Sequence, residues 1–201
     1  MQDNEINVDR LYLDNSCWEA ARISDTIMAE TIGFRHGQTS RKYFIYLLMD
    51  SNIFYQFEDR LRRFPHTINE GLVFLFLSGC FYVGKGQADR PADHLREATD
   101  LTNIGPKFDK VRELWDMGNG IVVLKSSCNS TSYEAATREA ILIDFFGLER
   151  LTNRRRGCYY GDAGEWSHNM LCNMGSFYIV KIIRESYGEY HRAVLKQDFA
   201  K

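Results

Sequence analysis

The sequence lacks any motif in which cysteines lie close together. Their number is odd, they are widely spread, and they form neither a C-x-x-C pair nor a Cys/His group with zinc spacing. The five cysteines are Cys17, Cys80, Cys128, Cys158 and Cys172. We therefore expect reduced thiols in an intracellular protein, which is nuclear or cytoplasmic in a eukaryote and cytoplasmic in a bacterium or virus.

The sequence also lacks a long apolar run, a secretory signal, internal repeats and low-complexity tracts. A membrane-spanning helix needs about 18 or more consecutive apolar residues, and a signal peptide needs an apolar segment near the N-terminus. The N-terminal part of this chain is too polar for one. We therefore expect no contact with a membrane.

An excess of positive charge is missing as well, because the formal net charge is -2 at pH 7. Neutralisation of phosphates supplies most non-specific affinity for DNA, so a DNA-binding chain of this composition must concentrate its basic residues locally. The candidate clusters are Arg60, Arg62 and Arg63, then Lys85 with Arg90, and the run Arg154-Arg155-Arg156. A run of three arginines taken alone is more often a solvated face. We expect weak intrinsic affinity for DNA.

What the chain does contain is enough apolar sequence for one sizeable core, with 44% hydrophobic and 13% aromatic residues in 201. We divide it into a polar N-terminal segment with a helix (1–40), a central domain (41–165) with an insert at 50–71, and a C-terminal helical extension (166–201). The predicted fold class is α/β, with a small three-stranded antiparallel or mixed sheet flanked by helices.

Hydrophobic pattern and capping signals predict the elements of this fold. Strands are expected at 43–49, 72–83 and 121–124. The insert at 50–71 is too long for a tight hairpin and is expected to contain a helical turn near 59–64. Helices are expected from Ser16 to about Glu30 with a stop at Gly33, near Pro91, from Pro106 to Gly118, from Thr131 to Gly147, and after Phe177. Glu134 is expected to complete a capping box with Thr131.

One short stretch concentrates reactive side chains. The segment 81–86 reads Phe-Tyr-Val-Gly-Lys-Gly and is followed by Arg90 and His94, which lie four residues apart on one side of the expected helix. Tyr82, Lys85, Arg90 and His94 thus place a phenol, an amine, a guanidinium and an imidazole at the end of an apolar strand. These groups suit chemistry on a phosphate.

The order of five elements between Tyr43 and Asn153 resembles the GIY-YIG endonucleases. The elements are Phe44-Ile45-Tyr46, Tyr82-Val83-Gly84, Arg90, Glu139 within an E-A-x-x-x-E-x-x-L-I pattern, and Asn153. Phe44 stands where the family has glycine. Details such as Tyr-Val-Gly-Lys-Gly and Leu-Thr-Asn at 151–153 are similar to the nuclease domain of LEM-domain, ankyrin-repeat endonucleases. The chain contains neither ankyrin repeats nor a recognisable LEM domain, so we expect an excised domain or a stand-alone relative.

The resemblance implies hydrolysis of DNA phosphodiesters to a 5′-phosphate and a 3′-hydroxyl, with branched or junction DNA as substrate. It also implies that Glu139 binds Mg²⁺, with Mn²⁺ as the alternative ion, because a carboxylate is a hard oxygen donor and magnesium keeps several waters. Tyr46 is the predicted general base, and Lys85 is the expected cation that lowers the pKa of its phenol. Tyr82 is expected to orient the attacking water or to contact the phosphate.

Further roles follow for the remaining predicted residues. Arg90 is expected to grip the scissile phosphate, His94 to relay or donate a proton, and Asn153 to hold the site together by hydrogen bonds. The residues expected to contact DNA are Lys85, Arg90, Arg154, Arg155 and Arg156. Taken alone, Tyr46 would be a core residue, His94 a helix-surface residue, Glu139 a salt-bridge partner and Asn153 a turn residue. Tyr159 and Tyr160 are expected to pack against the sheet.

Two other functions fit parts of the sequence. The loss of glycine at Phe44 is compatible with a nuclease fold that binds DNA or protein without cutting. The segment 79–85 also matches the first seven positions of a phosphate-binding P-loop, but Gly86 replaces the Ser or Thr that would bind magnesium. The nucleotide-binding hypothesis is therefore the more distant one.

Overall fold

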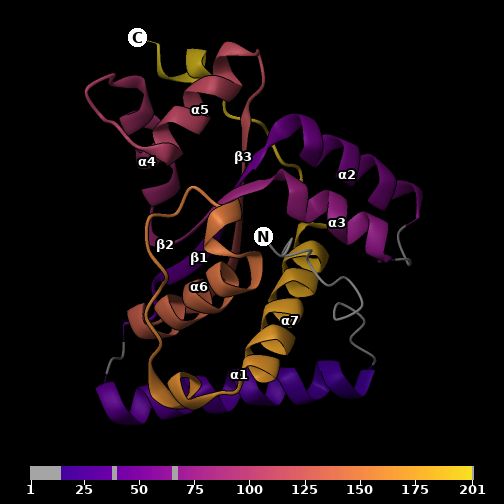
Figure 1. Ribbon diagram of the computed structural model, residues 1–201, viewed down its shortest axis with the longest axis vertical. Coiled ribbons are helices and arrows are strands. Elements are labelled where there is room, and N and C mark those ends of the chain that lie inside the picture. The colour runs from indigo at the N-terminus through magenta and orange to yellow at the C-terminus, as the bar shows by residue number, and fades with distance from the viewer. Residues whose placement is uncertain (1–14, 38–39, 65–67, 201) are drawn as a thin grey trace.

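In the computed structural model, residues 15–37, 40–64 and 68–200 are described, and they form a three-stranded antiparallel sheet surrounded by helices (Figure 1). The polar N-terminal segment up to residue 14 lies outside this range, as does Pro65 in the insert. The strand order is β2-β1-β3, with β1 (Tyr43–Asp50), β2 (Cys80–Gln87) and β3 (Ile121–Ser130). The predicted fold class and the antiparallel alternative are confirmed.

The central strand β1 alternates its side chains between two apolar layers, as a strand with period two must. Ile45, Leu47 and Met49 face the layer that α2, α3, α6 and α7 cover, whereas Tyr46 and Leu48 face the layer under α4 and α5. The helices are α2 (Ser51–Arg63), α3 (Glu70–Gly79), α4 (Arg90–Thr99), α5 (Pro106–Asp116), α6 (Ser132–Phe146) and α7 (His168–Ser186). Both faces of this small sheet are therefore buried.

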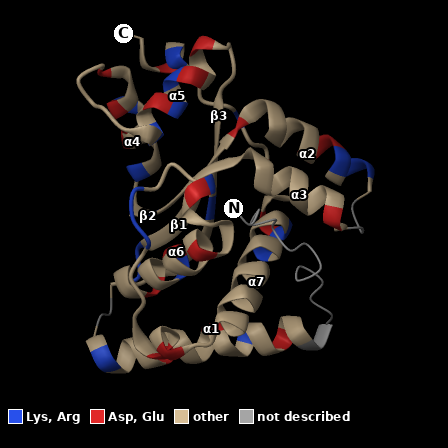
Figure 2. Cartoon of the chain, in the orientation of Figure 1, with Lys and Arg blue, Asp and Glu red and all other residues tan. Residues whose placement is uncertain are grey.

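The insert after β1 folds into two complete helices, so the prediction of a single helical turn near 59–64 is wrong in extent. α2 begins where Asp50 accepts a hydrogen bond from the Asn52 amide, and its last turn carries Arg60, Arg62 and Arg63 (Figure 2). The predicted strand at 72–83 is wrong over its first half, because residues 70–79 form α3. β2 begins only at Cys80.

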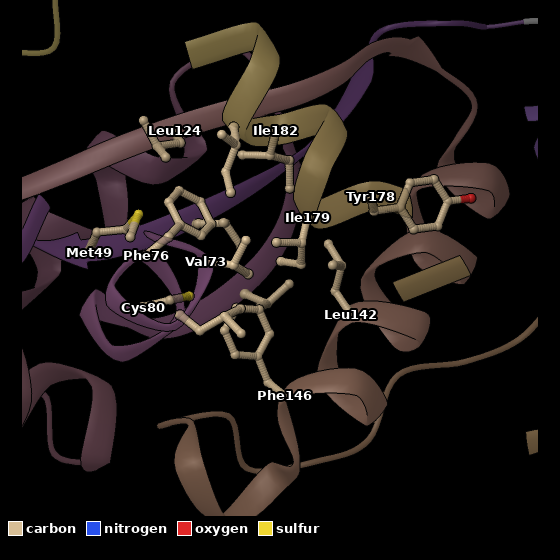
Figure 3. Close-up of a cluster of buried hydrophobic side chains, with 14 of the residues drawn as sticks. Met49, Val73, Phe76, Cys80, Leu124, Leu142, Phe146, Tyr178, Ile179 and Ile182 are labelled. Atoms are coloured by element: carbon tan, nitrogen blue, oxygen red, sulfur yellow. The ribbon is translucent and has the colours of Figure 1, made fainter. Parts of the chain in front are cut away.

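The core beneath α3 explains why this apolar run is helical. Val73, Phe76 and Leu77 on α3 meet Phe57 of α2, with the Phe57 and Phe76 rings 5.0 Å apart at their centroids. Figure 3 shows Phe76 and Val73 beside Met49 of the sheet and Ile179 of α7. A helix buries residues three and four apart on one face, which a strand of the same sequence would divide between two faces.

Helix α1 (Asn15–His36) lies across α7 and α6 at one end of the molecule (Figure 1). It continues through Gly33, so the predicted stop there is wrong. The helix ends instead at Gly37, which has a φ of 59° and donates its amide to the Gly33 carbonyl at 3.0 Å. Asp25 of α1 pairs with the buried guanidinium of Arg138 on α6.

The helix that carries Glu139 begins as expected but its capping box is half made. Thr131 Oγ1 accepts the Glu134 amide at 3.2 Å, which is the predicted N-terminal cap. The Glu134 carboxylate, however, binds Arg41 at 2.9 Å and Arg138 at 3.5 Å. Glu134 is thus part of a buried ionic cluster. α6 ends at Gly147 as predicted, and α7 begins nine residues before Phe177.

Short turns and one isolated strand pairing complete the fold. A 3-10 turn, η3 (Gly161–Glu165), lies against α1, and Val194 pairs with Ile121, the first residue of β3. The turn η2 (Leu148–Arg150) follows α6, and the turn η4 (Lys196–Phe199) is the last element before the C-terminus. Within the described residues, no helix is both long and apolar enough to cross a membrane.

Candidate active site

The site forms along the free edge of β2. In the strand order β2-β1-β3, β2 has a neighbour on one side only, so its outward backbone groups need other partners. Asn153 supplies two of them, because its Oδ1 accepts the Val83 amide at 3.1 Å and its Nδ2 donates to the Val83 carbonyl at 2.7 Å. Thr152 donates to the Phe81 carbonyl from its amide and its hydroxyl.

The third partner of this edge is Glu139. Its Oε1 accepts the Lys85 amide at 3.1 Å, which fixes the carboxylate of α6 beside β2. Burial raises the pKa of Glu139 to about 7, and the nearby charge of Lys85 acts in the opposite direction with a smaller effect. Burial thus disfavours the ionised Glu139 carboxylate, and a cation bound beside it would stabilise that form.

The two tyrosines meet across β1 and β2. Tyr46 pairs in register with Gly84, and its ring centroid lies 6.1 Å from that of Tyr82. A Cβ atom at Gly84 would lie 2.5 Å from Cζ and 2.6 Å from the hydroxyl oxygen of Tyr46. The Tyr46 ring thus lies directly over the Gly84 backbone, and only glycine leaves room for it.

The Tyr46 hydroxyl is buried and has no hydrogen-bond partner among the described residues. Burial raises the pKa of its phenol, and the neighbouring Tyr82 phenol raises it further, whereas Arg90 acts in the opposite direction. The cation beside Tyr46 is therefore Arg90. Lys85 instead directs its amino group to Ser132, with Nζ 3.3 Å from both the carbonyl and the hydroxyl oxygen.

Arg90 and His94 lie on the first turns of α4, as predicted, and both contact Glu97 of the same helix. Arg90 pairs with Glu97 at 3.0 Å, and His94 Nδ1 lies 3.0 Å from the other carboxylate oxygen. Lys107 Nζ lies 2.6 Å from the same nitrogen of His94. Burial and then the charge of Lys107 lower the pKa of His94, so its imidazole is neutral near pH 7.

Lys107 is a site residue that the sequence did not reveal. Its ammonium lies 4.9 Å from the Tyr82 ring centroid and 4.7 Å from that of Phe108, and burial lowers its pKa to about 8. It sits in the first turn of α5, where the helix dipole disfavours a cation. A lysine at this unfavourable position was the one feature of the sequence that could have indicated Lys107. Glu97 was also missed, although its spacing from His94 and Arg90 places it on the same face of α4.

A cavity of about 490 Å³ opens beside this edge. Among its lining residues are Tyr82, Lys85, Lys107, Glu139, Asn153 and the run Arg154–Arg156. Figure 2 shows basic residues along the segment that follows α6, next to β2. Tyr46 and His94 lie behind Tyr82, whose ring centroid is 5.9 Å from that of His94. Arg90 lines a second hollow that shares Lys85 with the first.

The predicted site residues thus form one cluster, and the arginine run faces the cavity. Arg154 donates to the Ile104 carbonyl at 3.1 Å, and Arg156 pairs with Asp144 at 2.8 Å. Tyr159 packs against the core, in line with the expected packing, and also donates to Asp144. Tyr160 does not pack against the sheet but lines the cavity.

The side chains around the cavity suit a magnesium ion better than a zinc ion. In the described part of the chain, no group of three or more His, Cys, Asp or Glu side chains could hold a metal. A single half-buried carboxylate is an arrangement that magnesium accepts, because magnesium retains waters and takes further oxygens from a phosphate. Glu139 would be the residue that holds it.

Comparison with known proteins identifies the family. The profile described as LEM-3-like GIY-YIG domain matches residues 43–201. The chain belongs to the LEM-3-like GIY-YIG family. The GIY-YIG domains are nucleases, and the paired positions Tyr46 and Gly84 carry the two halves of the name-giving pattern on neighbouring strands. The resemblance predicted from the sequence is confirmed.

Curated relatives agree with this assignment. Ankyrin repeat and LEM domain-containing protein 1 of Mus musculus is 32% identical over 170 residues, which cover 82% of this chain and 31% of the relative. The Homo sapiens protein of the same name is 31% identical over 166 residues, covering 77% and 26%. The Caenorhabditis elegans homolog is 27% identical over 165 residues, covering 79% and 22%. The chain spans about a third or less of these relatives' lengths, and no solved structure matches it significantly.

The structure removes the P-loop hypothesis. Residues 79–85 form the end of α3 and most of β2, so they are an extended edge of the sheet. A P-loop must instead curl around a phosphate in front of a helix N-terminus.

Proposed function

We propose that this GIY-YIG domain is a magnesium-dependent endonuclease that hydrolyses phosphodiester bonds in branched or junction DNA. One observation supports the proposal: a single cavity brings the half-buried carboxylate of Glu139 together with Tyr82, Lys107 and the arginine run at 154–156. In this proposal, Glu139 is the cation ligand and the basic side chains around it bind phosphates. This chemistry matches the needs of phosphodiester hydrolysis.

In the proposed reaction, each residue near the phosphate has a separate role. A divalent cation held by Glu139 would supply positive charge to activate water and to stabilise charge on the phosphate. Tyr82 orients the attacking water, and Tyr46 accepts its proton. Burial opposes ionisation of the Tyr46 phenol, so this role requires positive charge nearby. Arg90 supplies it, because its charge favours the phenolate.

The remaining groups hold the substrate and the site. Arg154, Arg155 and Arg156 bind phosphates on the cavity wall, and Lys107 places a further positive charge beside Tyr82. His94, neutral in the fold, would relay a proton: its Nδ1 takes one from the Lys107 ammonium, 2.6 Å away, as its Nε2 gives one to the departing oxygen. Asn153 acts as a positioning residue, because both of its hydrogen bonds go to Val83 in the strand between Tyr82 and Gly84.

Cleavage of supercoiled plasmid and of a DNA panel tests the proposal. The panel contains linear, nicked, flapped and four-way-junction DNA, each incubated with Mg²⁺, with Mn²⁺ or with chelator. We expect cleavage only with a divalent ion, preference for branched substrates, and loss of cleavage in Glu139→Gln. Glu149→Gln is the matched control, since Glu149 is an exposed carboxylate outside the cavity. Metal-independent cleavage, or equal cleavage by Glu139→Gln, would contradict the assignment.

The second candidate function is a domain that binds DNA without cutting it. The unpaired Tyr46 hydroxyl and its raised pKa favour this alternative, because an un-ionised phenol is a poor base. Binding of junction DNA by a protein that leaves every substrate intact in Mg²⁺ and Mn²⁺ would identify it. A nuclear or cytoplasmic location is a further expectation, which imaging of a tagged chain in cells tests.

A further inference from the structure

Three aromatic rings gather at one rim of the cavity, and no role in the cleavage reaction accounts for them. They are His36 at the end of α1, Tyr133 in the first turn of α6, and Tyr160 just before η3. The Tyr133 centroid lies 4.5 Å from those of His36 and Tyr160, and His36 lies 5.6 Å from Tyr160. Tyr160 also lines the cavity that contains Glu139.

The backbone beneath these rings is held firmly. The Tyr160 amide donates to Thr137 Oγ1 of α6 at 3.0 Å, and Arg35 of α1 donates to the Gly161 carbonyl at 3.2 Å. Below them, Met28 and Ile32 of α1 are fully buried in a small apolar cluster with Ala163. The three rings are therefore fixed in position by packing that is separate from their own mutual contacts.

The rings are not themselves buried. Tyr133 and Tyr160 are half-buried and His36 is exposed. An alternative reading is that they only attach α1 to the domain. Tyr133 and Tyr160 do pack against the buried apolar cluster, but the Asp25–Arg138 ion pair also attaches α1, and attachment alone does not explain why the rings keep part of their surface open to solvent.

The charge around the rings fits a nucleic-acid strand. Arg154, Arg155 and Arg156 line the same cavity as Tyr160, and Lys85 lies beside Ser132, the residue before Tyr133. The last turn of α1 also carries a basic residue, Arg35, which donates to the carbonyl of Gly161, the residue after Tyr160. Aromatic faces flanked by positive charge bind bases by stacking and phosphates by ion pairing.

We infer that His36, Tyr133 and Tyr160 form a stacking platform for an unpaired base of the DNA substrate. The inference rests on the proposed nuclease function and specifies how the substrate is selected. A base inside a duplex is covered on both faces by its neighbours, so only a base in a flap, fork or gap can stack on protein rings. The platform therefore selects DNA with a single-stranded segment next to the scissile bond.

Binding measurements in a Glu139→Gln background test the platform without interference from cleavage. The probes are a fluorescein-labelled duplex and the same duplex with a single-stranded flap that contains 2-aminopurine. For Tyr133→Leu with Tyr160→Leu, we expect flap affinity to fall by roughly 5-fold or more, with quenching of 2-aminopurine lost and duplex affinity unchanged. Leucine retains apolar packing, and His36→Ala provides a second, surface-only variant with an effect in the same direction.

Phe34→Leu is the matched control, because Phe34 is a 93% exposed aromatic residue on the same helix and makes no ring contact with the cluster. Flap binding equal to that of the Glu139→Gln parent in both platform variants would overturn the inference and leave the nuclease proposal intact. If the parent binds neither probe and the wild type cleaves neither, the proposed function itself fails.

Discussion

At Gly84 the chain has no room for a side chain, because the Tyr46 ring occupies the position of a Cβ atom. We predict that Gly84→Ala lowers the cleavage rate by about 100-fold, since displacing a reacting group by about 1 Å can cost that much. Steady-state cleavage of a junction substrate measures the effect.

Gly33→Ala is the control for this substitution. A Cβ atom at Gly33 meets nothing within 4 Å, and Gly33 lies inside helix α1. We expect this variant to cleave normally and to be stabilised by about 0.5–1 kcal/mol. Normal cleavage by Gly84→Ala would mean that the Tyr46 position is not critical.

His94 gives the fold a measurable dependence on pH. Its pKa is lowered in the folded chain by burial, so the unfolded chain takes up a proton near pH 6.5 while the folded chain does not. The free energy of unfolding should therefore fall as the pH drops through about 6.5. The groups that face the ring are Lys107, Arg90, Glu97, Tyr46 and Tyr82.

The variant His94→Gln should flatten this dependence. Urea denaturation at about pH 7.5 and pH 5.5 gives the free energy of unfolding of wild type and variant at each pH. The quantity to compare is the decrease in this free energy from about pH 7.5 to about pH 5.5, which does not depend on the absolute stability of either protein. An equal loss in wild type and variant would assign the dependence to other groups.

At the scale of elements, the sequence predicted the sheet and most helices but misassigned residues 72–79. The run Leu-Val-Phe-Leu-Phe-Leu is apolar throughout, so hydrophobic periodicity alone cannot separate a buried strand from a buried helix. The deciding signal was Asn69, whose Oδ1 accepts the Leu72 amide at 2.9 Å and caps α3. The stop predicted at Gly33 failed because a single glycine is tolerated inside a long helix that packs on others.

The candidate site was predictable where its residues follow a fixed order along the chain. Tyr82, Glu139 and Asn153 belong to the spaced family pattern, and the structure brings them to one edge of β2. Lys107 and His36 come from helices outside that pattern, so no spacing along the sequence indicates them. Only the packing of α5 brings Lys107 to the cavity, and only the packing of α1 brings His36 against Tyr133 and Tyr160.

Helix α1 should be essential for stability, although it precedes the matched residues 43–201. Asp25 is the α1 partner of the buried Arg138 guanidinium, at 2.8 Å, and also accepts the Tyr178 hydroxyl at 2.6 Å. We predict that Asp25→Ala lowers the free energy of unfolding by on the order of 3 kcal/mol, because it leaves a buried charge short of a partner. Chemical denaturation measures this loss.

Glu19→Ala provides the comparison on the same helix. Glu19 pairs with Arg22 on the solvent side, where an ion pair contributes little, so the denaturation midpoint should hardly change. A midpoint for Asp25→Ala that matches Glu19→Ala would show that α1 is only loosely attached.

At the scale of the whole molecule, a chain of net charge -2 must bind DNA through a local basic surface. The arginine run at 154–156 lines the cavity, whereas Arg60, Arg62 and Arg63 lie at the end of α2 on the other side of the molecule (Figure 2). The two clusters are similar in sequence, and only the fold shows which one adjoins Glu139.

The salt dependence of DNA binding should distinguish them. We predict that Arg155→Ala weakens binding and reduces the slope of log affinity against log salt by about 1, as the loss of one phosphate contact does. Fluorescence anisotropy between about 50 and 200 mM salt measures the slope. Arg62→Ala is the control and should leave the slope unchanged, while the reverse pattern would place the DNA on α2.

The exposed side of β2 carries one more consequence. A bare strand edge invites pairing with strands of other molecules and is a common origin of aggregation. Here the outward backbone groups of Phe81, Val83 and Lys85 are occupied by Thr152, Asn153 and Glu139. The same side chains that line the cavity thus cover this strand edge, so we expect substitutions at Asn153 or Glu139 that remove these hydrogen bonds to lower solubility.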